Sequence, residues 1–513
     1  MAAATAPLFN WLDTRSAGVL LHPTCIPGAF GIGMLGREAR QFVDFLHEAG
    51  LAWWQTCPLG PTSYGDSPYQ CPSAFAGNPY LIDLTALVDA GLLQAEQLAP
   101  LRALNQDRVD FGGIYWHQRP ILRAAFEVFR KSKTVALPYG EFAEFKARHA
   151  GWLDPFALFM ALKDHFEGHP WTQWPREFAS YASAHKSAAA TSLAQDIEAH
   201  RFNQYLFFGQ WRELRGYAAQ RGVSIIGDIP IFAALDSADV WAHPHLFEID
   251  PRTNRPLAVA GCPPDYFSAD GQYWGNPLYD WMAMKSEGYR WWLDRLGATF
   301  EICDVVRIDH FRGFESYWRI PADAPTARTG KWVPGPGLDF FASVSAAFAT
   351  ARIIAEDLGT LTDDVIKLRE ETGLPGMAVL QFAFGGKADN LYLPHNLTAN
   401  QVLYPGTHDN DTTLGWYATA SAAEQDHVRR YFRISGQEIP WDFVRAAYGA
   451  VSRLAVLPLQ DLLSLGSEAR LNTPGKPAGN WAWRYRQSQL EQLRRNSTHY
   501  LRELGEMYGR SAD

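Results

Sequence analysis

The sequence is poor in cysteine and in charged residues, and both shortages narrow the classes of protein that it can encode. Its five cysteines among 513 residues never form a CxxC pair, which argues against a disulfide framework or a structural zinc site and fits a reducing cytoplasm. Charged residues make up only 20% of the chain. No run of about 18 apolar residues is present, so we expect no membrane-spanning helix. The N-terminus also lacks the basic and apolar regions of a signal peptide.

The charge balance excludes further partners. A net charge of −9 repels phosphate backbones, and no dense basic run offsets it, so we expect no nucleic acid partner. Phosphate-binding loops and dinucleotide fingerprints are absent, so no organic cofactor is expected. Aromatic residues are abundant instead, at 14% of the chain, and 47% of all residues are hydrophobic. The chain can therefore build a large folded core.

Short apolar segments that end in polar clusters predict buried strands. Their continuous Val, Ile and Leu content is typical of parallel strands covered on both faces. Helical patterns lie between many of them, and this alternation predicts an α/β fold. The expected strands are residues 52–59, 223–231, 303–309, 352–357, 377–382 and 401–404, with 451–457 as a weaker candidate.

An open doubly wound sheet and a closed barrel both fit this alternation. At least four strands carry an acid at or just beyond their end, namely Asp228, Asp309, Glu356 and Asp409. Because barrel enzymes assemble the active site from several strand ends at one rim, this placement favours a (β/α)8 TIM barrel. We expect residues 1–513 to form one catalytic barrel with two insertions. Residues of about 85–200 form a largely helical insertion, and the loop-like residues of about 232–285 form a lid over the active site.

Two strand ends carry candidate catalytic acids. Arg307 and Asp309 are two residues apart on a strand, so they project from the same face, where the guanidinium favours an ionised carboxylate nucleophile. A purely structural ion pair fits this spacing equally well. Burial after an apolar strand would raise the pKa of Glu356 and suit a general acid, although a structural acid is the alternative. We expect the adjacent Asp357 to face the other way and to brace the following loop.

The remaining polar segments favour a sugar ligand. The loop GTHDNDTT at 406–413 offers oxygen ligands for a hard cation, but the calcium-loop pattern is missing, so we predict no metal site. Paired carboxylates are the equipment of a retaining glycosidase, and aromatic rings can cover the C–H faces of sugars. Each aromatic taken alone fits loop packing equally well. The candidate binding residues in segments 64–70 and 264–276 are Tyr64, Asp66, Ser67, Tyr69, Tyr266, Phe267, Trp274 and Asn276.

Several blocks in a fixed order carry a more specific signal. From about residue 18 to 484 they include PLGPTSYGDSPYQ, GDIPIF, PPDYFS, VRIDHFRGFESYW, AEDLG, GTHDNDTTLGW, GSEARLN and GNWAWR. This ordered set resembles the amylomaltases, the 4-α-glucanotransferases of the α-amylase clan. The resemblance implies a (β/α)8 barrel with inserted subdomains and no C-terminal β-sandwich. It also implies retaining transfer of α-1,4-glucan segments between maltooligosaccharides.

The resemblance also implies roles for individual residues. Asp309 is expected to be the nucleophile, Glu356 the general acid and base, and Asp409 a third carboxylate that stabilises the transition state. The positions around the cleaved sugar are matched by Tyr69, Asp228, Arg307 and His408. A loop over the cleft is matched by Tyr266 and Phe267, and further binding positions by Trp274 and Asn480.

Three other functions remain as alternatives. An α-1,4-glucan hydrolase of the same clan differs mainly in its acceptor. A metal-dependent barrel hydrolase would use His310 and His408 with the acids, although no three-ligand metal motif is present. A non-catalytic glucan-binding protein would need the aromatics but not the acids. We expect a cytoplasmic monomer or homodimer.

Overall fold

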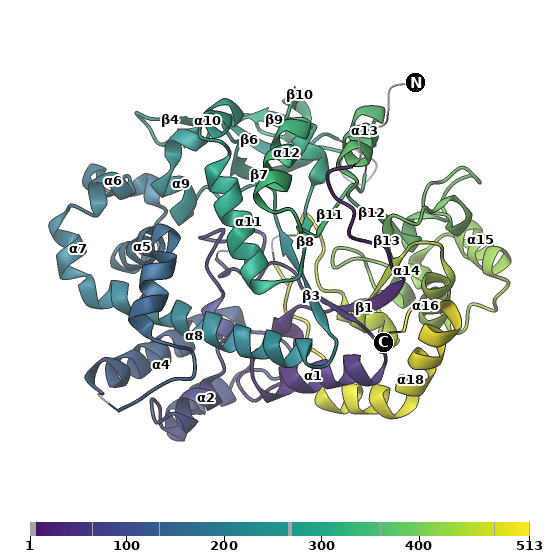
Figure 1. Ribbon diagram of the computed structural model, residues 1–513, viewed down its shortest axis with the longest axis horizontal. Coiled ribbons are helices and arrows are strands. Elements are labelled where there is room, and N and C mark those ends of the chain that lie inside the picture. The colour runs from purple at the N-terminus through teal and green to yellow at the C-terminus, as the bar shows by residue number, and fades with distance from the viewer. Residues whose placement is uncertain are drawn as a thin grey trace.

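Eight parallel strands form the centre of the molecule (Figure 1). The computed structural model describes residues 7–63, 65–132, 134–264, 269–359, 361–476 and 478–511. The strand order is β11-β8-β3-β2-β1-β14-β13-β12. The strands are β1 (Ser16–Leu20), β2 (Trp53–Gln55), β3 (Ser224–Ile229), β8 (Val305–Ile308), β11 (Ile353–Ala355), β12 (Gly376–Val379), β13 (Gln401–Tyr404) and β14 (Leu454–Pro458).

The two ends of this strand order meet. The N–H of Ala355 in β11 donates to the carbonyl of Pro375, directly before β12, at 2.9 Å. The sheet therefore closes, and the predicted (β/α)8 barrel is confirmed. The expected strands all lie in it, whereas the sequence interpretation missed β1.

Helices surround the barrel (Figure 1). They are α1 (Arg37–Glu48), α8 (Ala194–Ala219), α11 (Arg290–Ile302), α12 (Gly337–Ala347), α13 (Asp363–Thr372), α14 (Thr413–Thr419), α15 (Ala422–Phe432), α16 (Ile439–Gly449) and α18 (Gln487–Tyr508). In α1, the buried Ala39, Phe42, Val43 and Leu46 recur at helical spacing on one face, and burial of such a face stabilises the helix on the sheet.

Alternate residues of each barrel strand face the barrel interior and the helices. Ile226, Val305 and Ile354 pack inside with residues of the other strands, whereas Val306 and Ile353 belong to the cluster under the helices. Both faces are apolar, which explains the continuous hydrophobic pattern of these strands. Two positions further along, Asp228, Arg307 and Glu356 continue the three interior rows to the carboxyl end of the barrel.

The segment between β2 and α8 is mainly helical and forms the left side of Figure 1. It contains α2 (Leu84–Asp89), α3 (Ala99–Arg102), α4 (Phe111–Lys131), α5 (Phe142–His165), α6 (Tyr181–Ala184) and α7 (Ala188–Ser192). Helix α5 packs against α8, which in turn contacts the barrel strand β3. The boundaries proposed for this insertion stay a prediction.

The described residues between 232 and 285 contain more regular secondary structure than the expected loop. They contain α9 (Ala238–Ala242), β4 (Ile249–Asp250), β5 (Arg255–Pro256), β6 (Ala258–Cys262), β7 (Gln272–Pro277) and α10 (Trp281–Ser286). β6 and β7 join β9 (Ser316–Pro321) and β10 (Lys331–Pro334) in a sheet of order β10-β9-β6-β7. Half of this sheet follows β8 in the chain, so a local pattern could not predict it.

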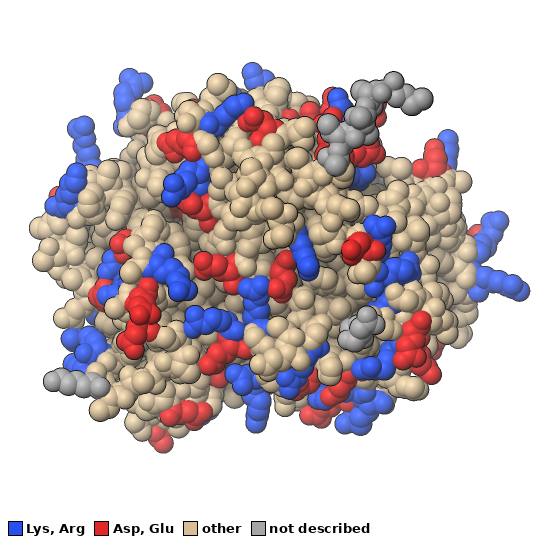
Figure 2. All heavy atoms as spheres, viewed as in Figure 1, with Lys and Arg blue, Asp and Glu red and all other residues tan. Residues whose placement is uncertain are grey.

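After β14, the described residues form α17 (Leu459–Leu462) and α18 but no further strand, so no β-sandwich follows the barrel in this part. None of the helices described is long and apolar enough to cross a membrane. On the face shown in Figure 2, Lys and Arg are interspersed with Asp and Glu, and neither sign forms a continuous patch.

Candidate active site

Arg307 links two carboxylates at the carboxyl end of the barrel. It lies beside Asp228 in the β3–β8 ladder, and its Nη1 donates to both oxygens of that residue at 2.8 and 2.7 Å. Its Nη2 lies 3.0 Å from Asp309 Oδ1. Burial alone would lower the pKa of Arg307, but Asp228 and Asp309 raise it well above its ordinary value. The guanidinium therefore stays charged and holds the side chain of Asp309 at the rim.

Tyr69 completes the binding of Asp228. Its hydroxyl donates to Asp228 Oδ2 at 2.6 Å, and its ring stacks on His408 with 5.2 Å between centroids. Trp481 packs against both rings, at 5.8 and 5.7 Å. Trp481 has a φ of +62°, a strained conformation for a bulky residue that tends to persist at functional sites. Tyr69 and Arg307 thus fix the carboxylate of Asp228, and its role in sugar binding stays a prediction.

Glu356 lies next to Asp309 in a different environment. Its Oε2 accepts the N–H of His310, the residue after Asp309, at 2.7 Å, and its Oε1 accepts the N–H of Leu358 at 2.8 Å. Burial, and then the negative charge of Asp309, raise the pKa of Glu356 to about 8. Glu356 is therefore protonated at neutral pH, as a general acid must be.

Asp409 is held by a loop from the far end of the chain. Its Oδ1 accepts from Asn472 Nδ2 at 2.6 Å and lies 3.3 Å from His408 Nε2. Arg470 donates to the backbone carbonyl of Asp409 at 2.6 Å. The side chain of Asp409 remains 46% exposed, so this third carboxylate is fixed but still accessible to a ligand.

Tyr69, Asp309, His408 and Asp409 line a cavity of about 310 Å³, a volume typical of ligand pockets. Trp274 forms part of its wall and meets His310 edge-on at 4.9 Å. Asn276 accepts from Gln70 Nε2 at 2.9 Å and so connects two walls. The segment proposed as a lid contributes Phe232, Gln272, Trp274 and Asn276, and the other lining residues include Ser67, Tyr69, Asp309, His408, Asp409, Asn472, Pro474 and Gly475.

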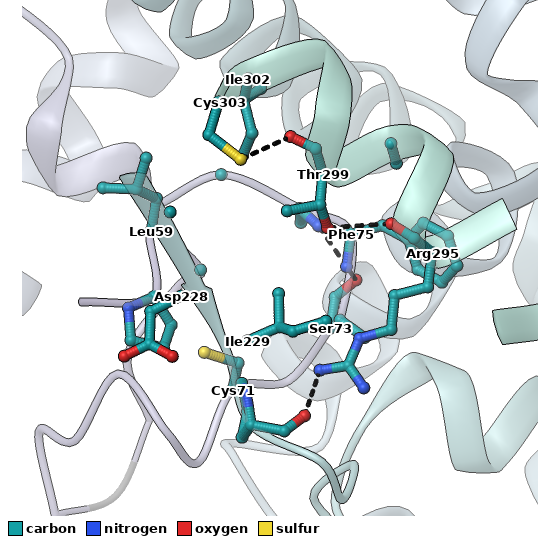
Figure 3. A pocket seen from close by; sticks show the side chains of 18 of the residues that line it. Leu59, Cys71, Ser73, Phe75, Asp228, Ile229, Arg295, Thr299, Ile302 and Cys303 are labelled. Atoms are coloured by element: carbon teal, nitrogen blue, oxygen red, sulfur yellow. Dashed lines mark hydrogen bonds between the residues drawn. The ribbon is translucent and has the colours of Figure 1, made fainter. Parts of the chain in front are cut away.

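A smaller cavity of about 60 Å³ lies behind Asp228 (Figure 3). Cys303 donates to the carbonyl of Thr299 at 3.2 Å, and Cys71 donates to that of Pro68 at 2.8 Å. Burial raises the pKa of each of these thiols to about 12, so both stay protonated and unreactive. At about 60 Å³ this cavity is smaller than a typical ligand pocket.

Other candidate residues lie elsewhere or cannot be placed. Asp66 lines a separate cavity of about 680 Å³ among the inserted helices. The amide of Asn480 is used within its own loop, where Oδ1 accepts from Thr473 N at 2.9 Å and Nδ2 donates to the Lys476 carbonyl at 2.9 Å. Tyr64, Tyr266 and Phe267 lie outside the described residues. The binding roles of all five stay predictions.

Sequence reasoning assigned no role to Trp481, Asn472 or Arg470, although all three contact the site. The signal was present in the blocks GSEARLN and GNWAWR, but nothing in a linear pattern shows that they reach Asp409 and His408. Among the described residues, no group of three His, Cys, Asp or Glu side chains is arranged to hold a metal ion.

Fold and site together define a class of protein. A closed barrel places Asp309 and the protonated Glu356 at neighbouring strand ends, and a cavity is lined by Asp309, Asp409, Tyr69 and His408. This arrangement is that of a barrel enzyme acting on glycosidic bonds.

Comparison with known proteins identifies the family. Residues 21–490 match the 4-alpha-glucanotransferase family, glycoside hydrolase family 77, and the chain belongs to it. It is 50% identical to the 4-alpha-glucanotransferase of Thermus thermophilus over 92% of this chain and 94% of the relative. It is 45% identical to that of Synechocystis sp. over 97% and 99%.

The solved structures agree. The amylomaltase from Streptococcus agalactiae, in complex with acarbose, superimposes with a TM-score of 0.91 at 37% identity, covering 97% of this chain and all of the other. The resemblance to the amylomaltases is confirmed, and the chain is a 4-α-glucanotransferase.

Proposed function

We propose that this enzyme transfers α-1,4-glucan segments between maltooligosaccharides by a retaining double displacement. The observation that carries the proposal is the contrast between Asp309, paired with Arg307 at 3.0 Å, and Glu356, whose pKa is raised to about 8. Two neighbouring acids in such different environments can act as nucleophile and general acid. Retention requires their carboxyl groups to lie about 5–5.5 Å apart, and this separation stays a prediction.

In the first half of the reaction, Glu356 donates its proton to the glycosidic oxygen while Asp309 attacks the anomeric carbon. The bond from that carbon to the leaving oxygen breaks, and a glucosyl ester forms on Asp309. In the second half, Glu356 takes the proton of the acceptor 4-hydroxyl, whose oxygen attacks the same carbon and releases Asp309. Asp409 and His408 bind the ring hydroxyls as positive charge develops on the sugar.

Transfer exceeds hydrolysis only if a sugar acceptor outcompetes water for the ester. The segment 232–285 supports this because Phe232, Gln272 and Trp274 lie in the wall of the cavity. We therefore assign it the role of a lid that excludes water. The 4-alpha-glucanotransferase relatives favour this reaction over hydrolysis.

Incubation with maltotriose tests the proposed reaction. We expect longer maltooligosaccharides and glucose, with a constant number of reducing ends and no effect of EDTA. Products are resolved by chain length while reducing ends are assayed in parallel. A rise in reducing ends without longer products would show a hydrolase instead, and a loss of activity in EDTA would indicate metal-dependent chemistry.

We assign Asp357 the role of a positioning residue for Glu356. Asp357 is the next residue after Glu356, so its side chain points away from the barrel interior. On that outer side, Oδ1 accepts the N–H of Met377 in β12 at 2.8 Å, and Oδ2 pairs with Arg369 of α13. Between β11 and β12, this carboxylate thus accepts a backbone N–H that a carbonyl of the neighbouring strand would otherwise accept. The strand end that carries Glu356 is thus fixed by its neighbour.

We expect Asp357→Asn to lower kcat by about 10- to 100-fold with little change in KM, because small displacements of a catalytic group are costly. The alkaline limb of the pH–rate profile should also shift, which a general loss of stability would not cause. The control is Asp364→Asn, which changes an exposed residue of α13, the helix that carries Arg369. An unchanged profile and kcat in Asp357→Asn would refute the assignment.

We also propose a cytoplasmic location and a monomeric or homodimeric state. Five free thiols support a reducing compartment. Cell fractionation and light scattering of the purified protein test these two points.

A further inference from the structure

The loop between β13 and α14, on the right side of Figure 1, carries two residues of the site, His408 and Asp409. β13 ends at Tyr404, and its pairing with β12 and β14 fixes the first end of the loop in the barrel wall. The second end is Thr413, the first residue of α14. The position of Asp409 therefore also depends on what holds Thr413.

Asp461 holds this second end. It lies on α17, which directly follows the barrel strand β14, and it is fully buried. Its Oδ1 accepts the N–H of Thr413 at 2.8 Å, and its Oδ2 accepts the hydroxyl of the same residue at 2.7 Å. Because β14 is the neighbour of β13 in the barrel, one carboxylate joins the start of α14 to the adjacent strand.

Helix capping does not explain Asp461. Thr412 already caps α14, since its hydroxyl oxygen accepts the N–H of Gly415 at 3.0 Å. Burial raises the pKa of Asp461 to about 6, so the carboxyl group is ionised at neutral pH. In the part of the chain that the structure describes, no cation pairs with it. A buried charge without a counter-ion lowers stability, and such local costs are typical of groups that serve function.

We propose that Asp461 is a positioning residue for Asp409, which it reaches through Thr413 and the loop backbone between them. Asn472 fixes the Asp409 carboxylate from the other side, at 2.6 Å. Both supports are needed because a group that stabilises developing charge must be in place before the reaction. The inference rests on the proposed function, in which Asp409 stabilises the transition state.

Asp461→Ala tests the proposal. It leaves the N–H and hydroxyl of Thr413 buried without an acceptor, so the loop should shift and kcat for maltotriose should fall about 10- to 100-fold. Asp461→Asn should restore most of the rate, because its amide oxygen and NH₂ group can still meet the two groups of Thr413. The control is Asp83→Ala, which removes the acceptor of the Thr85 N–H in α2 at 2.9 Å. It should lower the melting temperature and leave turnover unchanged.

A double-mutant cycle separates positioning from general stability. If Asp461 acts through Asp409, Asp461→Ala should slow the wild-type enzyme but have little further effect in Asp409→Asn. Damage unrelated to Asp409 would lower both rates by the same factor. Each rate is measured below the melting temperature of its variant. If Asp461→Ala does not fold, Thr413→Val enters the same cycle: it removes only the hydroxyl bond and should lower kcat about three- to tenfold.

Each other outcome counts against a specific step. Turnover of Asp461→Ala equal to that of Asp83→Ala, or effects that multiply in the cycle, would overturn the inference and leave the role of Asp409 intact. A wild-type rate in Asp409→Asn would refute the role that the proposed function gives to Asp409, and the inference with it. The two failures are therefore distinguishable.

Discussion

Asp309→Asn is expected to lower the rate of maltotriose transfer by at least about 10⁴-fold, because a neutral amide cannot form the glucosyl ester. The substitution preserves the shape of the side chain and gives up only the ion pair with Arg307 Nη2, which spans 3.0 Å. Arg307 keeps its two bonds to Asp228, so the site should stay assembled. Initial rates and a binding isotherm for maltotriose measure the two effects separately.

The same strand offers a matched control. Asp304 directly precedes β8 at the opposite end of the barrel, where it pairs with Arg215 at 2.6 Å and accepts the Ile225 N–H at 2.8 Å. Because the amino-terminal end of a barrel serves stability, Asp304→Asn should lower the melting temperature and leave turnover intact. If Asp309→Asn retained more than about a hundredth of the rate, Asp309 would not be the nucleophile.

The catalytic acids were predictable because a strand has a fixed period. Asp309 lies two residues beyond Arg307, and Glu356 two beyond Ile354, so each follows an interior row of an apolar strand. The same rule separates Glu356 from Asp357, which contacts β12 and α13 instead. Residue type and parity thus determined which side of the barrel wall each acid faces.

The missed strand β1 shows where this reasoning fails. Its sequence SAGVL contains small residues that carry little strand signal. Gly18 is required by packing: a Cβ there would lie 2.5 Å from the Cβ of Trp53 in β2. Only the paired strands make that requirement visible, since β1 also pairs with β14 near the other end of the chain.

Binding residues were harder to predict than catalytic ones because loop contacts decide their roles. Asn480 has the right chemistry for a sugar, yet its amide closes the turn from Thr473 to Lys476. Asn472, eight residues earlier in the same loop, reaches Asp409 at 2.6 Å. The sequence alone does not distinguish these two asparagines, because the path of the folded loop decides which of them reaches Asp409.

Glu356→Gln is expected to lower kcat/KM by about 10³-fold and to change the pH profile as well. In the wild-type enzyme the raised pKa of about 8 keeps Glu356 protonated at neutral pH, and the acid is lost as pH rises through that value. kcat/KM should therefore decline as pH rises through about 8. Glutamine does not titrate, so the residual rate of the variant should lack this alkaline limb.

An α-glucosyl fluoride donor separates the two roles of Glu356. Fluoride leaves without a proton, so Glu356→Gln should still form the ester, while its breakdown by an acceptor lacks a base. The glucosyl-enzyme should accumulate, and peptide mass spectrometry should locate the added glucosyl unit on Asp309. Accumulation on another residue would displace the nucleophile, whereas an alkaline limb that persists in Glu356→Gln would assign the acid to a different group.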